Sequence, residues 1–255
     1  MPTPLGFAFK GIGIRWSLQS KINLAIPTLM AELTTHSLVY SESPKYIAIE
    51  GPIGVGKTAL AEKLSKALGA RLVREPVIDN PFLERFYKDQ AKFAFQTQIY
   101  FLMERYQQQM QLNQPDLFTK GITVGDYLFA KDRIFAYLNL DKDELVLYEQ
   151  IYRLLDQRLV IPDLVIYLQA SVEVLLERIR RRKRTYEWGI PEDYLEEVIQ
   201  SYNKYFFHYN ESPLLVVNTS KIDFVKSQAD FNQLMEKIKS IKSGVEHFIP
   251  LGSAN

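Results

Sequence analysis

Short apolar runs recur along the chain, and stretches with helical periodicity separate them. The runs resemble buried parallel strands and lie at residues 46–50, 71–75, 122–126, 164–169 and 214–219. Between them, apolar residues recur every three or four positions, which predicts helices. Strands that alternate with helices predict right-handed crossovers and a parallel sheet. We therefore expect an α/β fold with a five-stranded parallel sheet flanked by helices.

Local signals mark where two of the helical regions begin. Asn80 precedes a proline, an arrangement that caps a helix, and the region runs to about Asn113 with a break near Asp89. Asp141 and Glu144 form a capping box ahead of the next helix.

Composition limits the class of protein. The 255 residues are 47% hydrophobic, enough for one domain with a sizeable core, and the formal net charge of +1 provides no global field for nucleic acid or an acidic membrane. The chain has no cysteine, which excludes disulfides and thiol catalysis and suits a reducing compartment. No apolar run is long enough for a membrane span. We expect a cytoplasmic protein without nucleic-acid or membrane partners.

The sequence divides into three segments. Residues 1–43 are expected to be a disordered extension or a mis-assigned start, because Met30 lies shortly before the first strand. Residues 44–245 are expected to form the one folded domain, and residues 246–255 a C-terminal tail.

Residues 51–58 read GPIGVGKT, a complete GxxxxGK[ST] phosphate-binding loop between a strand and a helix. Glycines let the backbone wrap around phosphate oxygens, the lysine reaches the outer phosphates, and the threonine hydroxyl suits Mg²⁺. We expect ATP or another nucleoside triphosphate to bind here. The expected contacts are Gly51, Gly54, Val55, Gly56, Lys57 and Thr58.

Two carboxylates at the ends of predicted strands are candidate site residues. Glu75 ends the second strand and is followed by a proline, so it is either a general base facing the crevice or a surface carboxylate. Asp126 ends the third strand and, with Thr58, is the candidate magnesium ligand.

The densest charge feature spans residues 178–184. Arg178 and Arg182 lie one helical turn apart, where two guanidinium groups can clamp a transferring phosphoryl group. A nucleic-acid contact or a solvated helix end are the alternatives. Together with the phosphate loop, the run favours a mobile, arginine-rich lid.

Gln98 and Arg105 are seven residues apart, so both project from one face of an aromatic-rich helix. Glutamine offers a donor and an acceptor side by side, a good match for a heteroaromatic base.

These motifs resemble the deoxynucleoside kinase family, in particular its bacterial deoxyadenosine and deoxyguanosine kinase branch. The resemblance covers roughly residues 45–224, including the phosphate loop, the Glu75-Pro76-Val77 motif and the Asn80-Pro81-Phe82-Leu83 motif. It implies that Glu75 takes the proton of the 5′-hydroxyl and that the enzyme is a homodimer built on helix packing. The other implied contacts are Tyr87 and Glu187 with the sugar 3′-hydroxyl, Gln98 and Arg105 with the base, and Arg178, Arg182 and Arg184 with phosphates.

One motif departs from the family. Gly125-Asp126-Tyr127 stands where many members carry Glu-Arg-Ser or Asp-Arg-Ser. In one register Asp126 replaces the acidic residue. In the other it replaces the arginine, and Lys131 takes the place of a later base-contacting aspartate. The base contact therefore stays open between Lys131 and Asp132.

Three functions follow from the motifs. The first is transfer of the γ-phosphate of ATP to the 5′-hydroxyl of a deoxynucleoside, with Glu75 as base and Lys57, Arg178 and Arg182 stabilising the transferring group. A nucleoside monophosphate kinase of the thymidylate kinase type is the second, although Glu75 and Glu187 oppose a charged acceptor. A P-loop regulatory or nucleic-acid-associated protein is the third.

Overall fold

The structure is a computed structural model that describes residues 44–76, 80–112, 121–156, 159–181, 187 and 189–249. The predicted extension over residues 1–43 lies outside these residues, as does the end of the predicted tail.

A parallel sheet forms the centre of the fold. Its strand order is β2-β3-β1-β4-β5-β6, and every neighbouring pair is parallel. The strands are β1 (Tyr46–Glu50), β2 (Arg71–Val73), β3 (Thr123–Gly125), β4 (Leu164–Gln169), β5 (Leu214–Asn218) and β6 (Val245–Phe248).

The prediction of five strands was wrong by one, because the described sheet has six. The missed strand, β6, lies at the edge of the sheet and pairs only with β5 among the described strands. It is short and half exposed, so it lacks the apolar run by which a buried strand is recognised. Part of it lies in residues that the sequence assigned to the tail.

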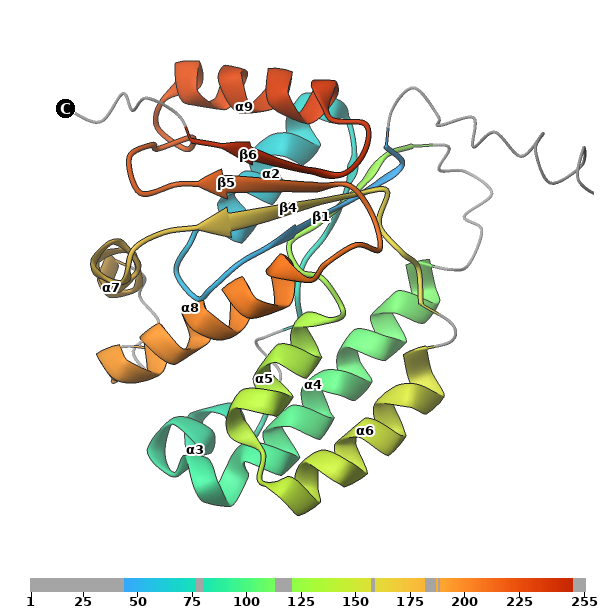
Figure 1. Ribbon diagram of the computed structural model, residues 1–255, viewed down its shortest axis with the longest axis vertical. Coiled ribbons are helices and arrows are strands. Elements are labelled where there is room, and N and C mark those ends of the chain that lie inside the picture. The colour runs from blue at the N-terminus through green and yellow to red at the C-terminus, as the bar shows by residue number, and fades with distance from the viewer. Residues whose placement is uncertain are drawn as a thin grey trace, which may run out of the picture. The chain divides into compact units, whose positions relative to one another are not determined.

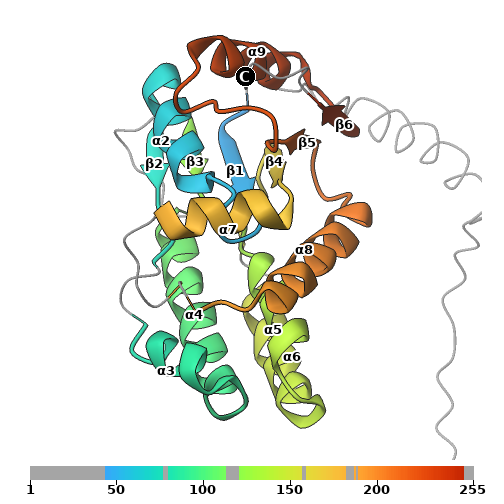
Figure 2. The same cartoon turned by 90° about the vertical axis from the view of Figure 1, so that its left-hand side faces the viewer.

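Helices cover both faces of the sheet. Figure 2 shows α2 and α9 on one side and α8, α5 and α4 on the other, while Figure 1 shows α4, α5 and α6 side by side. The described helices are α2 (Lys57–Leu68), α3 (Leu83–Lys88), α4 (Gln90–Leu112), α5 (Lys131–Asn139), α6 (Lys142–Asp156), α7 (Val172–Arg181), α8 (Glu192–Phe207) and α9 (Gln228–Ser240). Within these residues, no helix has the length and apolarity that a membrane crossing needs.

The predicted break near Asp89 and the capping box are confirmed. The predicted cap at Asn80 was wrong: α3 begins at Leu83 with Phe82 at the N-cap, and Asn80 Oδ1 accepts from the Phe82 N–H at 2.9 Å in the turn before it. Helices α3 and α4 are separated at Asp89. Ahead of α6, Asp141 Oδ1 accepts from the backbone N–H of Asp143 and Glu144 at 2.9 Å each, and Glu144 Oε2 accepts from the backbone N–H of Asp141 at 3.2 Å.

A buried carboxylate joins the sheet to the loops around the site. Glu50 ends β1, and its Oε1 accepts from the Gly51 N–H at 2.8 Å and from the Tyr202 hydroxyl at 3.0 Å. Its Oε2 accepts from the Leu128 N–H at 2.8 Å. Glu50 therefore ties the start of the phosphate loop to the segment between β3 and α5, which positions both against α8.

Candidate active site

The phosphate loop adopts the backbone that its glycines permit. Gly54 and Gly56 have φ of 86° and 107°, in the left-handed region that favours glycine. At Gly54 a Cβ would lie 2.8 Å from Ile179 Cγ1 and 3.0 Å from the Leu175 carbonyl oxygen, so only glycine lets α7 pack directly on the loop. Lys57 Nζ donates to the carbonyl oxygens of Gly51 at 2.6 Å and Pro52 at 3.1 Å. Its side chain therefore lies across the phosphate loop, where it is expected to contact the bound phosphates.

Asp126 lies beside the phosphate loop. Its Oδ2 accepts from the Thr58 hydroxyl at 2.7 Å, and its Oδ1 accepts from the Glu75 N–H at 2.6 Å. Asp126 therefore links the start of α2 to the segment that follows β2.

Thr58 and Asp126 also suit Mg²⁺, because the ion prefers hard oxygen ligands and keeps water and phosphate oxygens in its shell. In the described part of the chain, no group of three or more histidine, cysteine, aspartate and glutamate side chains forms a metal site. A site that shares its ion with substrate phosphates needs no such group.

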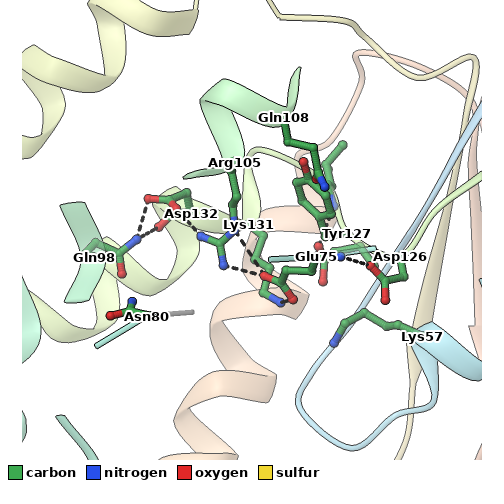
Figure 3. A network of polar contacts seen from close by, with 12 residues as sticks. Lys57, Glu75, Asn80, Gln98, Arg105, Gln108, Asp126, Tyr127, Lys131 and Asp132 are labelled. Carbon is green, nitrogen blue, oxygen red and sulfur yellow. Dashed lines mark hydrogen bonds and ion pairs between the residues drawn. The ribbon is translucent and has the colours of Figure 1, made fainter. Parts of the chain in front are cut away.

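The Glu75 carboxylate is held by two cationic side chains. Oε1 accepts from Arg105 Nη2 at 2.6 Å and Nε at 3.2 Å, and Oε2 accepts from Lys131 Nζ at 2.8 Å. Figure 3 shows Glu75 between Arg105 and Lys131, with Lys57 nearby. Burial raises the pKa of Glu75, but Lys131, Arg105 and Lys57 together hold it well below its usual range. Glu75 is therefore an ionised carboxylate, as a general base must be.

Asp132 organises a second part of the network. Its Oδ1 accepts from Gln98 Nε2 at 2.6 Å and from the Tyr148 hydroxyl at 2.8 Å, and its Oδ2 pairs with Arg105. The Gln98 amide nitrogen also donates to the Asp132 carbonyl oxygen at 2.8 Å. Asp132 is fully buried and is not among the residues that line the cavity, so it positions Gln98 and Arg105 from behind.

Most predicted site residues line one cavity of about 650 Å³. Those that line it are Lys57, Thr58, Glu75, Tyr87, Gln98, Arg105, Asp126, Lys131 and Glu187. Apolar walls that the sequence analysis did not assign to the site come from Phe86, Phe101, Phe135 and Tyr194. The ring of Phe101 lies 4.7 Å from the Arg105 guanidinium carbon. A cavity with aromatic walls and a few polar groups is typical of a small-molecule site.

Arg178 is placed differently from the expectation. It is not among the residues that line the cavity. Its Nη1 donates to the Val55 carbonyl oxygen and the Thr219 hydroxyl at 3.0 Å each, and Nη2 donates to the Thr219 carbonyl oxygen at 2.9 Å. In the trans peptide between Val55 and Gly56, the C=O and N–H groups point to opposite sides. The bond from Arg178 to the Val55 carbonyl oxygen therefore directs the Gly56 N–H away from Arg178. Arg182 and Arg184 lie outside the described residues.

Arg178→Met should therefore weaken ATP and ADP binding alike, by roughly 10-fold or more, because hydrogen bonds of a charged donor contribute about 1.5–3 kcal/mol. Turnover at saturating ATP should change much less. Calorimetric titration with both nucleotides and steady-state kinetics measure the two effects. Unchanged ADP affinity with a large fall in turnover would instead put this guanidinium on the transferring phosphate.

A strand-loop-helix phosphate site, a carboxylate held at the same cavity and a parallel sheet define the class of a P-loop kinase. Residues 47–243 match the model of the deoxynucleoside kinase family. The chain belongs to the deoxynucleoside kinase family.

Curated proteins that resemble this chain are deoxyguanosine and deoxyadenosine kinases. The chain is 36% identical over 200 residues to a deoxyguanosine kinase of Bacillus subtilis, covering 77% of this chain and 97% of the relative. It is 37% identical over 201 residues to a deoxyadenosine kinase of Dictyostelium discoideum, covering 76% and 78%. Among solved structures, a deoxyadenosine kinase from M. mycoides with bound dATP has 30% identity and a TM-score of 0.67, covering 76% of this chain and all of that one.

Proposed function

We propose that this deoxynucleoside kinase transfers the γ-phosphate of ATP to the 5′-hydroxyl of a deoxynucleoside, in nucleotide salvage. The observation that carries the proposal is the ionised Glu75 carboxylate, which faces the same cavity as Lys57 and Thr58 of the phosphate loop. The dATP-bound relative supports a nucleotide donor.

The donor half of the site consists of the phosphate loop and its neighbours. Backbone N–H groups of residues 51–58 and Lys57 bind the phosphates, and Thr58 and Asp126 would hold Mg²⁺, whose charge offsets that of the phosphates. Arg182 and Arg184 remain sequence-based predictions for phosphate contact.

The acceptor half of the site consists of the cavity-lining residues that are proposed to contact the deoxynucleoside. Glu75 removes the proton of the 5′-hydroxyl as that oxygen attacks the γ-phosphorus. Tyr87 and Glu187 line the cavity and are proposed to bind the sugar 3′-hydroxyl, while Gln98 and Arg105 contact the base.

The charge of the acceptor half also bears on the thymidylate kinase alternative. An acceptor phosphate needs cations that are available to it, whereas Arg105 is paired with both Glu75 and Asp132. Glu187 is a further carboxylate on the cavity wall. An uncharged sugar hydroxyl suits this wall better than a phosphate does.

We propose a homodimer that packs on α4 and α6, because large apolar side chains of these helices are exposed: Met103, Val146, Leu147 and Leu154. A cytoplasmic location fits a chain without cysteine.

A phosphorylation assay with labelled ATP against the four deoxynucleosides and their monophosphates tests the function. We expect a 5′-monophosphate product from at least one deoxynucleoside. Conversion of monophosphates to diphosphates, without any product from nucleosides, would favour the thymidylate kinase type. Absence of turnover with every acceptor would favour the regulatory alternative.

A further inference from the structure

Lys131 occupies an unusual place for a lysine. It is the first residue of α5, it is only 6% exposed, and it lines the cavity together with Lys57, Thr58 and Asp126. Its ammonium donates to Glu75 Oε2 at 2.8 Å. An ammonium has three donors, so this one retains donors beside the cavity. Burying a lysine costs free energy that a single ion pair offsets only in part, which indicates a role beyond stability.

The second cation on Glu75 is anchored. Arg105 donates to Glu75 Oε1 and also pairs with Asp132, and its guanidinium lies against the Phe101 ring. Moving Arg105 would leave the fully buried Asp132 without its cation. Among the described residues, Lys131 pairs with no carboxylate other than Glu75. Its ammonium lies 5.7 Å from the centroid of the Phe135 ring, at the end of a flexible four-carbon stem. Of these two cations, Lys131 is the one that can leave Glu75.

Glu75 also needs such a release. A carboxylate that accepts hydrogen bonds on both oxygens is a weak base. General-base catalysis is most efficient when the pKa of the base lies near the working pH. The 5′-hydroxyl must in addition reach one of the two oxygens. Oε2, which is held by Lys131, is the oxygen that becomes accessible without disturbing Arg105.

We propose that Lys131 is a catalytic residue that changes partner during the reaction, from Glu75 Oε2 to an oxygen of the transferring phosphoryl group. This inference rests on the proposed function of Glu75. As Lys131 moves, the 5′-hydroxyl takes its place and gives its proton to Oε2. The new bond joins O5′ to the γ-phosphorus, the bond from the γ-phosphorus to the bridging oxygen breaks, and its electron pair stays on the β-phosphate of ADP. Lys131 thereby supplies positive charge from the acceptor side, opposite Lys57.

The test compares Lys131→Met, Lys131→Gln and Lys131→Arg with the wild type. Both neutral variants should lower kcat by roughly 100-fold, in the range of one lost transition-state donor, while KM for the deoxynucleoside changes by less than about threefold. The arginine variant should recover part of kcat. A residue that only supports the fold would not lower kcat selectively while KM stays nearly unchanged.

Arg133→Met is the matched control. Arg133 lies two residues after Lys131 on α5, pairs with Glu149 at 3.0 Å and is not among the cavity-lining residues. Its kcat should stay within about twofold of wild type, as expected for a partly exposed ion pair.

Three results would overturn the inference: a kcat within about threefold of wild type for both neutral variants, a rise in KM alone, or an equal loss in the Arg133 variant. If the wild type itself phosphorylates no deoxynucleoside, the proposed function fails instead. If it does and the Lys131 variants remain active, only this inference fails.

Discussion

Glu75→Gln should lower turnover by roughly 100-fold or more, the usual contribution of a general base, and leave ATP affinity nearly unchanged. A glutamine amide has almost the shape of the carboxylate but cannot accept the proton of the 5′-hydroxyl. The phosphate loop does not depend on Glu75, because Lys57 bonds to the loop carbonyl oxygens and Asp126 bonds to Thr58. Steady-state kinetics gives the turnover, and calorimetric titration gives the ATP affinity.

Glu62→Gln is the matched control for this variant. Glu62 also lines the cavity, but it pairs with an exposed Arg74 at 2.9 Å and has no contact with Arg105 or Lys131. Its turnover should stay within about twofold of wild type. Unchanged turnover in the Glu75 variant would remove Glu75 from the mechanism.

Arg105→Met should reduce the free energy of unfolding by about 3–5 kcal/mol, the usual cost of leaving buried charges unpaired. The Arg105 side chain is 4% exposed and bridges two carboxylates, Glu75 and Asp132. Methionine fills much of the volume but compensates neither charge. Chemical denaturation of the two proteins measures the difference.

The loss of stability in the Arg105→Met variant should depend on pH. Burial raises the pKa of Asp132, and Arg105 is the strongest influence that opposes the rise. Without Arg105 this pKa should rise further. A carboxyl whose pKa is higher in the folded than in the unfolded state makes the protein less stable as pH rises. The stability difference between the variant and the wild type should therefore be larger near about pH 8 than near about pH 5.

The control is Arg74→Met, which removes an exposed ion pair and should reduce the free energy of unfolding by at most about 1 kcal/mol. A comparable loss in both variants would contradict a special role for Arg105.

Much of the fold could be predicted because buried parallel strands leave continuous apolar runs. Strand β1 is buried along its whole length, and the loop after it has a motif in which each residue type has a phosphate-binding role. The edge strand β6 was missed for the converse reason, since one of its sides has no described neighbour and it has no apolar run.

The site was predictable where spacing along one helix decides the geometry. Gln98 and Arg105 project together from α4 and line the same cavity, as their seven-residue separation predicts. Contacts between distant elements were not predictable in this way. Tyr148 reaches Asp132 from α6, and periodicity alone assigns that tyrosine to an apolar helix face.

Arg178 shows a related limit. Its spacing from Arg182 predicts a contact with phosphate, but the sequence does not reveal how closely α7 packs on Gly54. That close packing brings the guanidinium to the loop carbonyl oxygens. Likewise, the sequence does not reveal that the Thr58 hydroxyl donates to Asp126, a contact between two distant elements.

The most direct test of the central claim is a crystal structure of the enzyme with a deoxynucleoside and a non-hydrolysable ATP analogue. We predict that the 5′-oxygen lies within about 2.6–3.2 Å of a Glu75 carboxylate oxygen, on the side that faces the γ-phosphate over Lys57. A 5′-oxygen beyond hydrogen-bond reach of Glu75, with another carboxylate such as Asp126 closer to it, would contradict the account.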